Sequence, residues 1–366
     1  MSGHRSHEPG DAPATSTTPP IIDEAVALRI AALVAPTQRS DAREAARLRA
    51  AVAADLVEVD RAARAWTGLG AELPPTHVQV VSRTGWVRAN LVGLRGALDP
   101  LSLRLRTSPA GRRVGARLVG MQLGTLLGLL STKVLGQFIL PLGGPGRSQL
   151  VLVGPNLLEL GRRHGTLADD VRRTVLLHEL AHRLQFDAVP WLGEHLRGLL
   201  RRYLDAARLD PAVLVELLGR IPEVLRALRE EASLTPILQL VLTDEQRAVV
   251  EEAQAMMSLL EGHGNATMYG AAHGVVRDPE RVRAALEERR TDLAARILTA
   301  VAGLELKRRQ YREGERFVRK VVEQVGTEGL NRAFSGPTSL PTPREIGDPE
   351  AWLTRVHGGA QGQATP

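Results

Sequence analysis

The chain lacks cysteine altogether, and this absence narrows the chemistry that it can carry out. Without a thiol there can be no disulfide, no thiolate metal ligand and no cysteine nucleophile. Any metal ion would have to be held by histidine and carboxylate side chains. Aromatic residues are also scarce, at 3% of the 366 residues, whereas alanine, leucine and valine abound. Such a composition favours helices that pack through aliphatic side chains over a β-sandwich or barrel.

Lysine is almost missing as well, so nearly all of the 47 basic residues are arginine. The formal net charge of +6 is of the sign that suits a nucleic-acid or anionic-membrane partner. However, 41 acidic residues are interspersed with the basic ones, as on an ordinary solvated surface. We therefore expect no nucleic-acid partner.

The first twenty residues are polar and proline-rich and contain no apolar run of the kind found in targeting signals. The sequence predicts a disordered tail over residues 1–20 and a cytoplasmic location.

The longest apolar run covers residues 118–142 and is a candidate for a membrane-spanning helix. Its glycines recur at the four-residue spacing of close helix contacts. Gln122, Lys133 and Gln137 interrupt the run with polar groups that a bilayer penalises. The sequence thus favours a buried core helix over residues 118–142 and no stable membrane insertion.

Local signals predict a strand over 149–153, which Gly-Pro-Asn ends, and then a helix that begins at Thr166 and stops before Pro190. Asp169 lies at the capping-box position after Thr166. Further helices are predicted around 192–206, 211–230 and 243–270, and at two or three places within 278–334.

These elements predict a mainly α (α+β) fold with a small sheet beside the helix that ends before Pro190. One main domain is expected over residues 21–340, between the N-terminal tail and an extended, proline-rich C-terminal arm and tail over 341–366.

His178, Glu179 and His182 form the sequence HELAH inside this helix. Because the two histidines are four residues apart, they differ by about 40° around the helix and about 6 Å along it, so both imidazoles can reach one ion. Glu179 is placed beside the ion, where a carboxylate can take a proton from water and pass it to a leaving amine. This is the HExxH arrangement of zinc peptidases, and the alternative is a pair of packed core histidines.

A hydrolytic zinc site needs a third protein ligand and an open position for water. The candidates are Glu194, His195, Glu261, His263 and His273. Glu261 fits best, because it lies in a long predicted helix with Asn265 four residues later on nearly the same face. His263 projects about 200° away from Glu261 and is kept as an alternative ligand or a transition-state donor.

The spacing of Glu261 and Asn265 resembles that of gluzincins, in which an Asp four residues after the glutamate ligand hydrogen-bonds a ligand histidine. This resemblance makes Asn265 a candidate to orient a ligand histidine, since its amide oxygen can accept a hydrogen bond from an imidazole N–H. Tyr269, His195 and His273 are candidates for stabilising the oxyanion of a tetrahedral intermediate. Trp191 is expected to seat the loop after the HELAH helix through its buried area.

Taken together, the motifs resemble those of a known family, the bacterial zincin-like hydrolases, some of whose members are labelled as associated with deazaflavin coenzyme biosynthesis. The resemblance extends over residues 20–356 and rests on GTLLGLLSTKVLGQF, LVLVGPN, HELAHRLQFDAVPWLGEHL, MSLLEGHGNATM and the run from LELKRRQ to LTRV. It implies a zincin-type fold, zinc ligands at His178 and His182, a catalytic Glu179, and Glu261 as the glutamate of the EGH motif. After that motif the family usually has an acidic residue where this chain has Asn265.

We therefore expect a zinc-dependent hydrolase, and more specifically a metallopeptidase that cleaves amide bonds of a peptide or protein substrate. Two alternatives remain open. One is a catalytically silent zincin-fold binding or scaffold protein, to which Asn265 and the lack of a clear oxyanion donor point. The other is a zinc hydrolase of a non-peptide amide or ester, which would use the same metal ligands.

Overall fold

The computed structural model describes residues 20–35, 41–102, 108–143, 147–206, 243–287 and 308–358. These residues form a mainly helical fold with one small sheet, which confirms the predicted fold class. The helix predicted around 211–230, residues 1–19 of the predicted tail and residues 359–366 lie outside the described residues.

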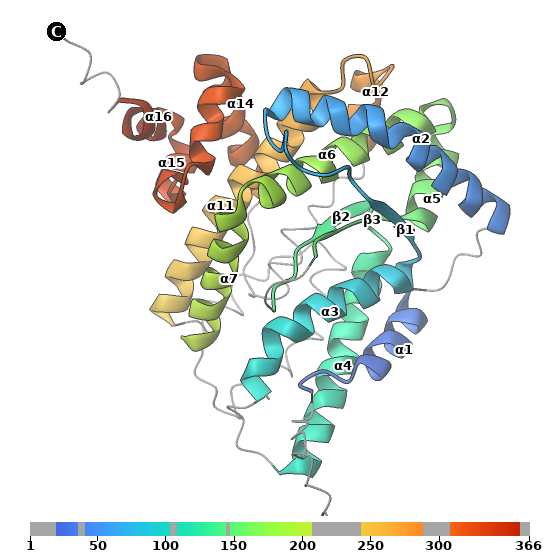
Figure 1. The fold of residues 1–366 in the computed structure, drawn as a ribbon. Helices are drawn as coiled ribbons and strands as arrows, with labels where there is room; N and C mark the ends of the chain where they lie inside the picture. The colour runs from blue at the N-terminus through green and yellow to red at the C-terminus, as the bar shows by residue number, and fades with distance from the viewer. Residues whose placement is uncertain are drawn as a thin grey trace, which may run out of the picture.

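Twelve α-helices are described in these ranges and carry the labels of Figure 1. The first six are α1 (Glu24–Val34), α2 (Ala42–Thr67), α3 (Arg83–Ser102), α4 (Pro109–Ser131), α5 (Gly154–His164) and α6 (Ala168–Ala188). The others are α7 (Pro190–Asp205), α11 (Asp244–Gly270), α12 (Pro279–Glu287), α14 (Arg308–Asn331), α15 (Pro343–Gly347) and α16 (Pro349–His357).

The sheet has three strands in the order β1-β3-β2. β1 (Val78–Val81) runs parallel to β3 (Gln149–Val153), and β2 (Gly136–Ile139) runs antiparallel to it. The strand predicted over 149–153 is therefore confirmed, and it lies at the centre of the sheet. Among the described residues, the edge strands are β1 and β2.

Helices cover both faces of the sheet (Figure 1), because β3 is apolar on both sides. Leu150 and Leu152 face the core around α6, α2 and α5, whereas Val151 and Val153 face the core around α1, α3 and α4. Successive strand residues point to opposite faces, so a strand buried on both sides reads as a continuous apolar run. A third core, away from the sheet, joins α7, α11, α14 and α16.

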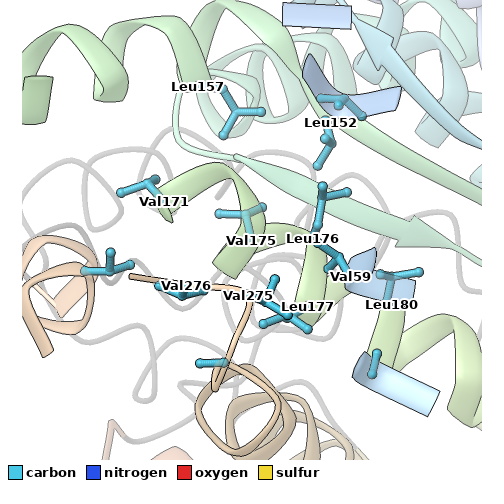
Figure 2. Packing of buried hydrophobic residues seen from close by; sticks show 14 of the residues in the cluster. Val59, Leu152, Leu157, Val171, Val175, Leu176, Leu177, Leu180, Val275 and Val276 are labelled. Atoms are coloured by element: carbon cyan, nitrogen blue, oxygen red, sulfur yellow. The ribbon is translucent and has the colours of Figure 1, made fainter. Parts of the chain in front are cut away.

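α6 carries the histidines of the HELAH motif on one face, and its opposite face is packed into a hydrophobic core. Val171, Val175, Leu176 and Leu180 pack into the core shown in Figure 2, together with residues of α2, β3 and α5. Ion pairs add to this packing: the buried Asp55 of α2 accepts from Arg172 Nε at 2.7 Å and from Arg173 Nε at 2.9 Å. A motif fixed in this way holds its side chains in one orientation.

The start of α6 differs from the prediction. The helix begins at Ala168, after a 3₁₀ turn over Gly165–Leu167, so Thr166 and Asp169 do not form a capping box. The reason is that Leu167 is buried in the core and draws the turn inward, while Asp169 pairs with Arg172 at 2.8 Å. The end of the helix at Ala188, just before Pro190, is as predicted.

The other predicted helices agree with the observed helices to different degrees. The prediction over 243–270 is confirmed as α11, with the capping box between Thr243 and Gln246. The prediction over 192–206 corresponds to α7, which begins two residues earlier because Pro190 suits the first turn of a helix. Within 278–334 the described helices are α12 and α14.

The apolar run over 118–142 is not one helix, and that prediction is wrong. α4 ends at Ser131, and residues 136–139 form the edge strand β2. Among the described helices, α4 is long and apolar enough to cross a membrane, with 44% of its most apolar stretch buried in the protein. It packs against α1, but Val114, Leu118 and Met121 are exposed. The absence of membrane insertion therefore stays a prediction.

The C-terminal segment is helical where an extended arm was predicted. Residues 343–347 and 349–357 form α15 and α16, each with proline in the first turn and with Thr342 and Asp348 as side-chain caps. Trp352 is fully buried in the core of α11 and α14, and its Nε1 donates to Ser339 O at 2.9 Å. The prolines thus start helices instead of extending the chain.

The packing of α4 on α1 generates a prediction about the glycines of α4. A Cβ at Gly124 would collide with the backbone of Ala27, whereas a Cβ at Gly115 would meet nothing within 4 Å. We expect Gly124→Ala to lower the free energy of unfolding by about 1–3 kcal/mol. The matched control Gly115→Ala should raise it by about 0.5–1 kcal/mol. Urea unfolding measures both, and equal effects would contradict the close contact of α1 and α4.

Candidate metal centre

Two histidines of α6 face away from its hydrophobic core and towards each other. The Nε2 atoms of His178 and His182 are 3.1 Å apart, and the two rings lie edge to face. This is the geometry that the four-residue spacing predicts for one face of a helix. The leucines between and around them, Leu176, Leu177, Leu180 and Leu184, are fully buried.

Glu261 of α11 completes a cluster of three side chains. Its Oε2 lies 3.5 Å from His178 Nε2, and its Oε1 lies 3.7 Å from His182 Nε2. Among the described residues, this is the group of three that could hold a metal ion. All three side chains are half-buried.

The separations in this cluster fit a zinc ion. Ligand atoms about 2.0–2.1 Å from a tetrahedral ion lie about 3.3–3.4 Å from one another. The Nε2 atoms of the two histidines are 3.1 Å apart, and the two carboxylate oxygens of Glu261, one facing each histidine, lie 3.5 and 3.7 Å from them, so each separation is close to that value. Two imidazoles and one carboxylate are also a donor set that zinc accepts, and they leave a fourth position for water.

A glycine lets α11 approach the histidines closely enough to form this cluster. A Cβ at Gly264 would lie 3.0 Å from His178 Cε1 and 3.3 Å from His182 Cε1. Any larger side chain at this position would therefore press on both rings. Gly264 stands inside the EGHGN segment, but nothing in the sequence alone marks it as the residue that contacts the histidines.

Glu179 lies on the sheet side of the cluster and is almost fully buried. Its Oε2 accepts a hydrogen bond from the backbone N–H of Phe138, in β2, at 2.9 Å. Gly136, at the start of β2, makes room for this carboxylate, since a Cβ there would lie 2.7 Å from Glu179 Cγ. The sequence gives no signal for either contact, because β2 lies within the apolar run over 118–142, for which a helix is predicted.

The surroundings of Glu179 alter its acidity. Its pKa is raised to about 7: burial is the main cause and the carboxylate of Glu261 acts in the same direction, while His182 and the Phe138 N–H act in the opposite direction. A carboxylate with a pKa in this range can both accept and return a proton near neutral pH. This is the property expected of the general base in the sequence analysis.

His263 is not a metal ligand in the described structure, and Asn265 does not orient a ligand histidine, although the sequence made both residues candidates for these roles. His263 is buried away from the three-residue cluster, where its Nδ1 lies 2.8 Å from Gln185 Nε2. Burial lowers its pKa to about 3, so the ring is neutral. Asn265 forms no hydrogen bond to either histidine within the described chain, and Gln185 Oε1 instead lies 2.9 Å from His182 Nδ1. Gln185 was missed, although it follows His182 by one helical turn.

The remaining candidates lie outside the cluster as far as the chain is described. His195 lies 3.6 Å from Glu252, Glu194 pairs with Arg197 on the surface, and His273 is exposed. The ring of Tyr269 lies 4.9 Å from the guanidinium of Arg283. Trp191 donates from Nε1 to Phe334 O at 2.9 Å, which ties the start of α7 to the segment after α14.

Comparison with known proteins gives two matches. A family model described as zincin-like metallopeptidase matches residues 22–353, a range that includes the whole cluster. A solved structure from Chloroflexus aurantiacus, described as a "putative hydrolase with a novel fold", is 27% identical to this chain, with a TM-score of 0.67. The alignment covers 92% of this chain and 98% of that one. No curated protein matches the chain.

The cluster generates a prediction about metal content. We expect one zinc ion per chain after zinc is supplied and excess metal is removed, because three ligand atoms already converge. His178→Ala and His182→Ala should each abolish this binding, whereas the control His195→Ala should retain it. Elemental analysis gives the stoichiometry. Less than about a tenth of an equivalent in the unaltered protein would contradict a three-ligand site.

Proposed function

The chain belongs to the zincin-like metallopeptidase family, and on this premise we propose that it is a zinc-dependent peptidase with His178, His182 and Glu261 as metal ligands. The family match confirms the resemblance inferred from the motifs. It also supports a divalent metal and a hydrolytic reaction. The observation that carries the proposal is the convergence of three ligand atoms beside the buried carboxylate of Glu179.

When bound, a zinc ion with three protein ligands supplies a position for water, lowers the pKa of that water and polarises a carbonyl oxygen. Glu179 would accept a proton as the water oxygen adds to the carbonyl carbon. Its bond from Phe138 N–H holds one carboxylate oxygen in place, so that the other can take this proton. The proton then passes to the nitrogen as the C–N bond breaks, which yields an acid and an amine.

The β2 edge of the sheet, which no further strand pairs with in the described part of the chain, supports a peptide as the substrate. The N–H of Val153 donates to Leu135 O, so the backbone groups of Gly136 and Phe138 point outward from β3. The Phe138 N–H meets Glu179 on that outer side. An extended chain that paired with β2 would therefore run past Glu179, and such pairing binds peptides through backbone hydrogen bonds.

An apolar surface adjoins the same edge. The rings of Phe138 and Phe186 stack with centroids 5.7 Å apart, and both side chains are half-buried. Phe186 follows Glu179 by seven residues on α6 and so lies on nearly the same helix face. Two of the four phenylalanines in the chain thus offer a surface suited to an apolar substrate side chain near the scissile bond.

Two other functions use the same geometry and are decided by experiment. A hydrolase of non-peptide amides or esters would need the same ligands and the same base. A silent scaffold was considered because Asn265 brings no charge to a ligand histidine. That reason is weaker now, because Gln185 is the residue that contacts His182.

The separate roles proposed for Glu179, as proton acceptor, and Glu261, as metal ligand, can be tested by matched substitutions. Glu179→Gln keeps the shape of the side chain but removes the proton acceptor, so zinc should stay bound while hydrolysis falls by about 10²- to 10⁴-fold or more. Glu261→Gln should weaken zinc retention first and lose activity as a result. If Glu179→Gln lost the metal while Glu261→Gln stayed loaded and active, the proposed roles would be wrong.

The substrate for these measurements comes from an unbiased peptide library, with an amide and ester panel in parallel. Peptide cleavage by the unaltered protein but not by Glu179→Gln supports the peptidase. Cleavage of the panel alone supports the non-peptide hydrolase, and zinc binding without any cleavage supports the scaffold.

A further inference from the structure

Gln185 is a buried amide that contacts both helices of the metal centre. It is fully buried, and it lies on α6 one turn after His182. Its Oε1 is 2.9 Å from His182 Nδ1. Its Nε2 is 3.0 Å from Leu260 O and 2.8 Å from His263 Nδ1, both on α11.

The partners of this amide fix its orientation. Leu260 O can only accept a hydrogen bond, so the group that faces it must be the NH₂ of Gln185. The reverse orientation would place two oxygens 3.0 Å apart in a site without exposure to water. Gln185 Oε1 must therefore face His182 Nδ1, and it can only accept.

The orientation of Gln185 in turn fixes the tautomer of His182. Because Oε1 accepts, the proton of the neutral His182 ring must be on Nδ1. Its Nε2 then carries the lone pair that points at His178 and Glu261. The second proton of the Gln185 NH₂ is donated to His263 Nδ1, which accounts for that nitrogen as well.

We propose that Gln185 is the positioning residue of the metal centre, setting the tautomer and ring orientation of His182 before a metal ion binds. Its bonds to α11 also flank Glu261, since Leu260 precedes that residue and His263 follows it by two. One amide therefore aligns a ligand of α6 with the segment that carries the ligand of α11. The role in metal binding rests on the proposed function, but the tautomer does not.

The direct test is NMR of the metal-free protein labelled with ¹⁵N-histidine, at about pH 8.5, where histidines of ordinary pKa are neutral. We expect His182 in the Nδ1–H form. In Gln185→Met, which keeps the length of the side chain but has no amide, the Nδ1–H form should no longer dominate. His182 found in the Nε2–H form in the unaltered protein would overturn the proposal, and this result needs no variant.

Zinc affinity gives the second readout, through competition with a chelator. Gln185→Met should weaken zinc binding by about 10- to 100-fold, as for other residues that orient a ligand histidine. Gln185→Glu should also weaken it, because a carboxylate has no proton for Leu260 O or His263 Nδ1.

The control for lost stability is Thr267→Val. It removes another fully buried hydrogen bond of α11, from Thr267 Oγ1 to His263 O, without touching a ligand. Thr267→Val should leave both the His182 tautomer and the zinc affinity unchanged.

An unchanged tautomer in folded Gln185→Met, or zinc affinity within about threefold of the unaltered protein, would overturn the positioning role. A protein that cleaves no peptide yet shows the expected tautomer and affinities would contradict the peptidase and support this role.

Discussion

The close crossing of α6 and α11 is the constraint on which the rest of the structure depends. The two histidines lie on α6 and Glu261 lies on α11, so the cluster exists only while these helices stay in register. Gly264 permits the approach, and Gln185 bonds the two helices beside the ligands. The cores on either side then hold each helix in place, one through the sheet and α2, the other through α14 and α16.

The small sheet matters for the metal centre because its edge strand β2 lies beside Glu179 of α6. β2 is the edge strand next to α6, and one of its outward-pointing N–H groups meets Glu179. The carboxylate is thereby buried between a helix and a strand, and that burial is the main cause of its raised pKa. A proton acceptor and a strand that is at the edge of the sheet among the described residues thus lie side by side, next to the three ligand atoms. A reaction on an extended amide chain needs these features together.

Much of this arrangement follows from sequence because its signals are local. The spacing of His178 and His182 predicted their shared face, and helical periodicity favoured Glu261 over His263. β2 was not predicted, because a strand and a helix of apolar residues look alike in a short run. The sequence pointed to Asn265 and not to Gln185, because the partner of a ligand histidine depends on how two helices meet, which periodicity along one helix does not give. In the C-terminal segment, the proline content predicts an extended chain, but Thr342 and Asp348 cap helices that begin with these prolines.

The central claim is that α6 and α11 bring three ligand atoms to one ion. Anomalous X-ray diffraction at the zinc absorption edge, from crystals of the zinc-loaded protein, tests it most directly. We expect one strong peak, about 2.0–2.2 Å from His178 Nε2, His182 Nε2 and a carboxylate oxygen of Glu261. A peak bound by other residues, or by the two histidines with Glu261 turned away, would contradict it.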